Sequence, residues 1–490
     1  MNFLNKKTCW LLLVAILSAS CSKKPNSDKV KITISKAEGI PSSMLEIYHY
    51  PGIGAVILGE ENLDPGDTAS LELDVLNLFM ANIQIGDINK IIFLEPGYDL
   101  TISIEGDSLN KKLIFTGKNA DANNYLSKVS SIYDKVWKRG IANLELVNFL
   151  ARYDSIKTEL ENFHKDYTDT HTLSSEVTKL LENTNTIQLL KMRMAYAFHL
   201  HNSALGDQLY AFRDKKSIEP FVMPSELKGV VTEIPFDTTF FKMELYGYRD
   251  LLIYYMMEIE NQHVIVENWN KPKPNLPIES DQMIKEGNYP STIQEFFVAR
   301  NINSCMREQG ITPQIDSLYS DFKRNFNTSI YLADLQKTYE GQIAILPGTA
   351  APDFSGQTIT GKVVSLSDFK GKIVYVDVWA TWCGPCVEEI PSSIILQNQY
   401  ANNKKVVFLN VSADKDIEKW KKFLEKKPNW VGVHINQTPD QNELMCTDYR
   451  VVGYPKYFLV DQSGKIVTAK APRPSNSSAK RMLDELLKPI

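Results

Sequence analysis

The 490-residue sequence has few cysteines, no excess of positive charge and no internal repeat. Six cysteines in a chain of this length are too few to form a disulfide-bonded scaffold. The net charge is −5, and no basic patch is interleaved with aromatic residues, so we expect no nucleic-acid partner. The composition, 43% hydrophobic and 23% charged, is ordinary for a globular protein. The length predicts roughly two to four domains.

No apolar run is long enough to span a bilayer, but a short one near the N-terminus has the pattern of an export signal. Two lysines precede an apolar stretch over residues 10–17, and small residues at 18–20 lead directly to Cys21. This arrangement resembles a bacterial lipoprotein signal, which implies an acylated Cys21 and a polar tether. An ordinary cleaved signal is the alternative. Either reading places the mature chain outside the cytoplasm, and the first places it on the cell envelope, lipid-anchored and facing the periplasm.

Hydrophobic periodicity divides the chain into regions. The signal peptide takes residues 1–20 and the tether residues 21–28. Alternating apolar residues and turn pairs over residues 29–118 predict an antiparallel β sandwich or barrel. Apolar residues at three- and four-residue spacing predict an all-α domain over residues 119–345. Strands that alternate with helices predict an α/β domain over residues 346–490.

Two cysteines in the last region carry the clearest chemical signal. The β-branched and aromatic run from Val374 to Trp379 predicts a buried strand, and the apolar spacing after Cys386 predicts a helix. Cys383 and Cys386 therefore stand at a strand-to-helix junction, where free N–H groups and the helix dipole stabilise a thiolate. Cys383 becomes a nucleophile, and Cys386 is close enough to attack any mixed disulfide that Cys383 forms. The pair predicts a redox site.

Other kinds of site that use a closely spaced cysteine pair are excluded, because the sequence lacks residues that they require. A zinc ribbon needs a second close pair of cysteines or histidines, which the sequence does not contain. A c-type haem site needs histidine directly after the second cysteine, and residue 387 is valine. A peroxiredoxin would have proline before the threonine, whereas Ala380 precedes Thr381. We therefore expect no metal.

The segment Trp382-Cys383-Gly384-Pro385-Cys386 after a buried strand resembles the thioredoxin active site. The flanking segments 351–354, 366–372 and 378–383 resemble the TlpA and ResA type, which are membrane-tethered thiol–disulfide oxidoreductases of the bacterial envelope. The resemblance extends from about residue 347 to the end. It implies a thioredoxin fold and a redox-active Cys383–Cys386 disulfide in place of any cofactor. Residues 114–126 resemble an uncharacterised domain found ahead of such modules in envelope lipoproteins.

The resemblance assigns roles to the reacting groups. Cys383 is the exposed nucleophile and Cys386 the resolving thiol. Asp377 matches a buried aspartate that exchanges a proton with the resolving cysteine, and a carboxyl in a dry site has a raised pKa. Glu388 and Glu389, on the following helix, are expected to be solvated charges.

A second set of residues faces the substrate. Tyr454-Pro455 matches the family's cis-proline, which packs against the disulfide, and Trp382 completes the expected substrate-binding surface. Cys305 and Cys446 stand apart and are expected to be buried free thiols. A regulatory role for Cys446 is the alternative, because it precedes Tyr454-Pro455 by a few residues.

The direction of electron flow is predicted from the two residues between the cysteines. Gly-Pro is the thioredoxin arrangement, with a reduction potential of about −270 mV against about −120 mV for the oxidant DsbA. We therefore expect an enzyme that reduces disulfide-bearing envelope proteins and is itself reduced by a membrane electron donor. The alternatives are a disulfide oxidase or isomerase, and a partner-binding lipoprotein with a vestigial redox site.

Replacing Cys21 with serine removes the thiol that would carry the lipid. We expect wild type to fractionate with membranes and the C21S variant to be released, because no acyl chain holds it there. The C9S variant is the matched control, since Cys9 lies inside the predicted signal, and it should stay with membranes. Membrane association of C21S equal to that of wild type would contradict acylation at this position.

Overall fold

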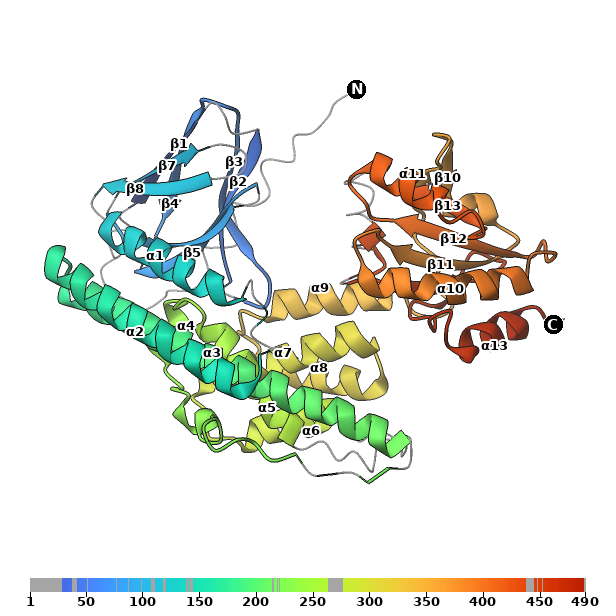
Figure 1. The fold of residues 1–490 in the computed structure, drawn as a ribbon. Coiled ribbons are helices and arrows are strands. Elements are labelled where there is room, and N and C mark those ends of the chain that lie inside the picture. The colour runs from blue at the N-terminus through green and yellow to red at the C-terminus, as the bar shows by residue number, and fades with distance from the viewer. Residues whose placement is uncertain are drawn as a thin grey trace. The chain divides into compact units, whose positions relative to one another are not determined.

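The computed structural model describes residues 29–488 with internal gaps at 38–41, 51, 76, 87, 98, 107–110, 118–119, 138–139, 141–143, 214–215, 218, 220, 263–275, 438–444, 447 and 452. The predicted signal peptide, the tether and Cys21 lie outside these residues. The chain forms two compact units that divide between residues 267 and 268, with residues 52–54 belonging to the second. Figure 1 labels the helices and strands described below. This boundary falls inside the predicted helical domain, and the predicted three-domain division stays a prediction.

Two four-stranded sheets form the N-terminal part of the first unit. They share one core of alternating apolar residues, to which Ile32 of the first sheet and Ile47 of the second both contribute. Their strand orders are β4-β1-β7-β8 and β3-β2-β5-β6. The strands are β1 (Lys29–Lys36), β2 (Ser43–His49), β3 (Val56–Leu63), β4 (Thr68–Asp74), β5 (Phe79–Ile85), β6 (Ile88–Leu94), β7 (Leu100–Gly106) and β8 (Lys111–Gly117).

One strand pair differs from the predicted antiparallel arrangement. Strand β1 pairs in parallel with β7, with Ile32 opposite Leu100, whereas β1 and β4 are antiparallel. The prediction is therefore wrong for this pair. The physical reason is that β1 and β7 are far apart in sequence, so no hairpin turn imposes their relative direction.

Helix α1 (Ala120–Trp137) closes one side of the sandwich through two consecutive asparagines. Asn123 is fully buried; its Oδ1 accepts from the Phe93 N–H at 2.8 Å and its Nδ2 donates to the Phe93 carbonyl at 3.0 Å. The Nδ2 of Asn124 donates to the Phe115 carbonyl at 3.2 Å. Phe93 lies on β6 and Phe115 on β8, the end strands of the two sheets. The side-chain amide of Asn123 thus takes the place of a further strand on an edge that would otherwise be unpaired.

The remaining helices follow α1. In the first unit they are α2 (Leu146–Thr170), α3 (Ser175–Arg213), α4 (Thr238–Lys242) and α5 (Tyr248–Gln262). In the second unit, ahead of the C-terminal domain, they are α6 (Leu276–Glu286), α7 (Ser291–Gln309), α8 (Pro313–Asn325) and α9 (Leu332–Ile343). Within the described ranges, no helix combines the length and the apolar character needed to cross a bilayer.

A seven-stranded mixed sheet with helices forms the C-terminal domain, in the order β10-β9-β13-β12-β11-β14-β15. Strand β11 lies near its centre and is buried at all seven positions, parallel to β12 and antiparallel to β14. The elements are β9 (Ser355–Gln357), β10 (Val363–Ser365), β11 (Ile373–Trp379), α10 (Gly384–Gln399), β12 (Val406–Ser412), α11 (Ile417–Glu425), β13 (Val433–Asn436), β14 (Lys456–Val460), β15 (Ile466–Thr468) and α13 (Ser477–Leu486).

Side chains alternate across β11 and so separate two cores. Val374, Val376 and Val378 point into one of them. Tyr375 points to the opposite face, where it packs with Leu396 of α10 and with residues of α13. This arrangement is the predicted thioredoxin-like α/β fold, and it places α10 against the odd-numbered side chains of β11.

Removing the Asn123 amide should destabilise the first unit. We expect N123A to lower the free energy of unfolding by about 3 kcal/mol, because both backbone groups of Phe93 are left buried without this partner. N124A, which loses one partly buried hydrogen bond, should cost about 1 kcal/mol. Urea denaturation of the two variants tests this. Equal losses would contradict the edge-covering role of Asn123.

Candidate active site

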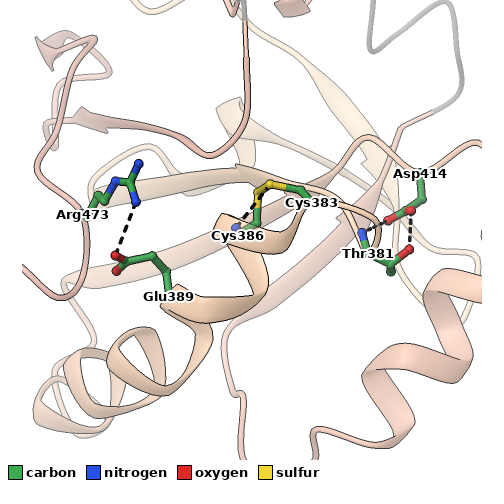
Figure 2. The surroundings of a disulfide bond; sticks show 6 residues. All are labelled: Thr381, Cys383, Cys386, Glu389, Asp414 and Arg473. Carbon is green, nitrogen blue, oxygen red and sulfur yellow. Dashed lines mark hydrogen bonds and ion pairs between the residues drawn. A yellow bond between two sulfur atoms is a disulfide. The ribbon is translucent and has the colours of Figure 1, made fainter. Parts of the chain in front are cut away.

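The two cysteines form a disulfide at the start of α10 (Figure 2). Cys383 is the N-cap residue, and its Sγ accepts a hydrogen bond from the backbone N–H of Cys386 at 3.2 Å. Strand β11 ends at Trp379, so only four residues separate the buried strand from the helix. The first sulfur therefore lies where the unpaired N–H groups of a helix favour negative charge, as the sequence predicts.

Both sulfurs are largely covered in this disulfide form. Cys383 is 6% exposed and Cys386 is 3% exposed, whereas the neighbouring Trp382 is 60% exposed. The predicted exposure of Cys383 therefore does not hold in this state, because apolar residues of β11, α10 and α11 pack around the cysteines and Tyr454 packs against the same cluster.

Asp377 lies on β11 between Tyr375 and Trp379, on the face that α10 covers. Its side chain is buried, and its Oδ1 has no hydrogen-bond partner among the described residues. Burial, with a smaller contribution from the negative charge of Glu389, raises the pKa of Asp377 to about 8. The carboxyl is therefore mostly protonated near neutral pH in the disulfide form, in line with the raised pKa expected from the sequence.

Glu389 is buried, which corrects the prediction of a solvated side chain. Its carboxylate accepts from the backbone N–H of Ser475 at 3.1 Å and from the Ser475 hydroxyl at 2.8 Å. Arg473 Nη1 lies 3.8 Å away (Figure 2). Glu388 is exposed as predicted. The spacing could have revealed this difference, because Glu389 follows Cys386 by three residues and shares its helix face.

A second carboxylate, Asp414, lies on the other side of the disulfide (Figure 2). It accepts hydrogen bonds from the N–H and the hydroxyl of Thr381, two residues before Cys383. Sequence reasoning missed this residue. The available signal was its position just after β12, since the carboxyl ends of neighbouring parallel strands meet at one edge of a sheet.

The peptide bond between Tyr454 and Pro455 is cis, as the resemblance implied. The Tyr454 ring meets the Trp382 ring edge to face, with centroids 5.6 Å apart. The three predicted substrate-facing residues thus include two aromatic rings in contact beside the disulfide.

Within the described ranges, the two cysteines outside the disulfide, Cys305 and Cys446, are free thiols. Cys305 is buried and its Sγ donates to Asn301 Oδ1 at 3.4 Å. Cys446 is half-buried, with its Sγ 3.7 Å from the Tyr454 hydroxyl, and burial raises the pKa of its thiol. A raised pKa disfavours the reactive thiolate, so Cys446 is poorly suited to act as a nucleophile.

Among the described residues, no group of three or more His, Cys, Asp or Glu side chains is arranged to hold a metal ion. A disulfide lies at the start of α10, a protonated carboxyl lies on the face of β11 that this helix covers, and an ion-paired glutamate lies on the helix itself. This set can exchange two electrons and a proton.

A family match and two sequence relatives point to the same chemistry. The Redoxin family matches residues 346–486. The thioredoxin-like protein YneN of Bacillus subtilis is 36% identical over 135 residues, which cover 27% of this chain and 76% of that protein. The thiol-disulfide oxidoreductase ResA of Bacillus thuringiensis is 32% identical over 143 residues, covering 29% and 78%. The crystal structure of the thioredoxin domain of a Bacteroides vulgatus thiol-disulfide oxidoreductase is 31% identical and covers 29% of this chain and 99% of that one, with a TM-score of 0.27.

The pKa of Asp377 predicts a pH-dependent stability. Between about pH 4 and pH 8 the folded protein holds a proton that the unfolded chain has lost, so raising the pH weakens the fold. We expect the stability of oxidised wild type, relative to D377N, to fall by about 1.4 kcal/mol per pH unit between about pH 5 and 7. Chemical denaturation at several pH values measures this difference. E388Q, at an exposed position, should track wild type, and a D377N curve parallel to wild type would refute the shift.

Proposed function

Because this chain belongs to the thioredoxin-like thiol–disulfide oxidoreductases, as its similarity to ResA and YneN shows, we propose that it reduces disulfide bonds in proteins outside the cytoplasm. The observation that carries the proposal is the Cys383–Cys386 disulfide at the N-terminus of α10, with a buried, protonated Asp377 on the strand face that this helix covers.

The first step uses the reduced enzyme. The N-terminus of α10 favours the thiolate of Cys383, which attacks one sulfur of a substrate disulfide. The bond between the substrate sulfurs breaks as the bond between Cys383 and the substrate forms. The displaced substrate thiolate takes a proton from water, and the enzyme and substrate are joined by a mixed disulfide.

The second step releases the product. In the fraction of molecules whose Asp377 is ionised, this carboxylate takes the proton of the Cys386 thiol, and the Cys386 sulfur attacks Cys383. The second substrate thiolate leaves, so two electrons have moved from the enzyme dithiol to the substrate. The enzyme ends as a disulfide with a protonated Asp377, and these are the groups described above. A dithiol donor at the membrane then regenerates the enzyme.

Substrate proteins would bind beside the disulfide at Trp382, Tyr454 and Pro455. Trp382 is mostly exposed and its ring is supported by Tyr454, so it offers a large contact surface with limited freedom to lose. The proposed substrates are disulfide-bearing envelope proteins, with the enzyme held at the periplasmic side of a membrane by a lipid on Cys21. This location rests on the sequence of the signal.

Trapping of mixed disulfides tests the proposal. A C386S variant can form the mixed disulfide but cannot resolve it, so it should accumulate covalent adducts with envelope proteins that dithiothreitol releases. The matched C383S variant lacks the attacking thiol and should accumulate none. Non-reducing electrophoresis followed by mass spectrometry detects the adducts. An absence of adducts from C386S, with no insulin reduction by wild type, would favour the partner-binding alternative.

The reduction potential of the wild-type protein tests the direction of electron transfer. We expect the Cys383–Cys386 couple, equilibrated in glutathione or dithiothreitol buffers, to have a potential nearer about −270 mV than about −120 mV. A potential near about −120 mV would contradict the reductase proposal and favour a disulfide oxidase.

A further inference from the structure

Asp414 is a buried carboxylate beside the disulfide that the reaction above does not use. It is 3% exposed and lies two residues beyond the end of β12. Its carboxylate accepts three hydrogen bonds: from the Thr381 N–H at 2.9 Å, the Thr381 hydroxyl at 2.6 Å and the Ser412 hydroxyl at 2.8 Å. All three partners donate, which suits the ionised carboxylate. Two of the three bonds hold one residue, Thr381, by two different atoms.

Thr381 occupies the turn that leads into the reactive cysteine. The Cys383 N–H donates to the Ala380 carbonyl at 3.1 Å, which closes a turn with Thr381 and Trp382 at its centre. The next residue after this turn is Cys383, whose Sγ must lie close to the N–H of Cys386 to benefit from the helix N-terminus. The position of Thr381 therefore determines where the sulfur lies.

Asp414 is itself fixed by the neighbouring strands. The Nδ2 of Asn436, on β13, donates to the Asp414 carbonyl at 2.9 Å and to the Ser412 hydroxyl at 3.2 Å. The Ala413 N–H donates to the carbonyl of Trp379, the last residue of β11, at 2.9 Å. The segment 412–414 that carries the carboxylate is thus bonded to β11 and β13 and continues β12, which makes it a rigid support for the turn.

We propose that Asp414 is a positioning residue for Cys383: it holds Thr381 at two atoms and so keeps the reactive sulfur at the N-terminus of α10. This inference rests on the proposed role of Cys383 as the attacking thiol. Asp414 has a second effect of opposite sign, because its negative charge near Cys383 disfavours a thiolate. The positioning effect is the larger one, since the benefit of a helix N-terminus is lost within one turn of the helix.

The proposal can be tested because positioning by Asp414 lowers the pKa of the Cys383 thiol, whereas the charge of Asp414 raises it. The pH dependence of Cys383 alkylation by iodoacetamide would be measured in a C386S background, so that the tryptic peptide 373–404 carries one thiol, and quantified by mass spectrometry. We expect D414A and T381V to raise the midpoint of this pH profile by about one pH unit relative to the C386S background. At pH values below the midpoints of background and variant, Cys383 should then react about tenfold more slowly in the variant. T381S keeps both hydrogen bonds and should match the background protein.

Each other outcome is informative. If Asp414 acted only through its charge, D414A would lower the midpoint and T381V would leave it unchanged. If it served only folding, both variants would melt at a lower temperature with an unmoved midpoint. Either result would overturn the proposal, and T381V, which keeps the carboxylate, supplies the test if D414A does not fold.

The failure of this inference can be told apart from the failure of the reductase proposal. No substrate protein takes part in the alkylation. Trapped partners together with an unmoved midpoint would refute the role of Asp414 alone, and a raised midpoint without trapped partners would refute the reductase alone.

Discussion

The hydrogen bond from the Cys386 amide to the Cys383 sulfur can form only because a buried strand gives way to a helix within four residues. Strand β11 is covered on both faces, so its direction and depth in the domain are fixed by packing. Helix α10 then starts at the edge of the sheet, and its first free N–H groups meet the sulfur. The reactivity of Cys383 is thus a consequence of how the central strand is buried.

The two buried acidic side chains, Glu389 and Asp377, have different surroundings. The Glu389 side chain accepts two hydrogen bonds from Ser475 and pairs with Arg473. Asp377 has no comparable donor at its Oδ1 among the described residues, and it lies within the field of Glu389. Asp377, whose pKa is raised to about 8, is therefore the carboxyl that can exchange a proton near neutral pH.

The parts of this architecture that local pattern determines could be predicted from the sequence. The strand over 373–379, the helix after Cys386 and the thiol pair follow from residue types within a short window. The hydrogen-bond partners of Glu389 and Asp414 could not be predicted in this way, because they lie far along the chain: Ser475 for the first and Thr381 for the second. The parallel pairing of β1 with β7 is likewise non-local. The lipid on Cys21 stays a prediction, since it falls outside the described residues.

The first strand has a mechanical consequence for a protein held by its N-terminus. Strand β1 begins at Lys29 and is bonded to β4 on one side and β7 on the other. A lipid on Cys21 would leave eight residues, 21–28, as a leash whose reach is at most about 28 Å. Any pull along this leash would load the hydrogen bonds of an interior strand in shear, on both of its sides at once, rather than peel an edge strand away. If Cys21 carries a lipid, the sandwich would bear tension along an interior strand.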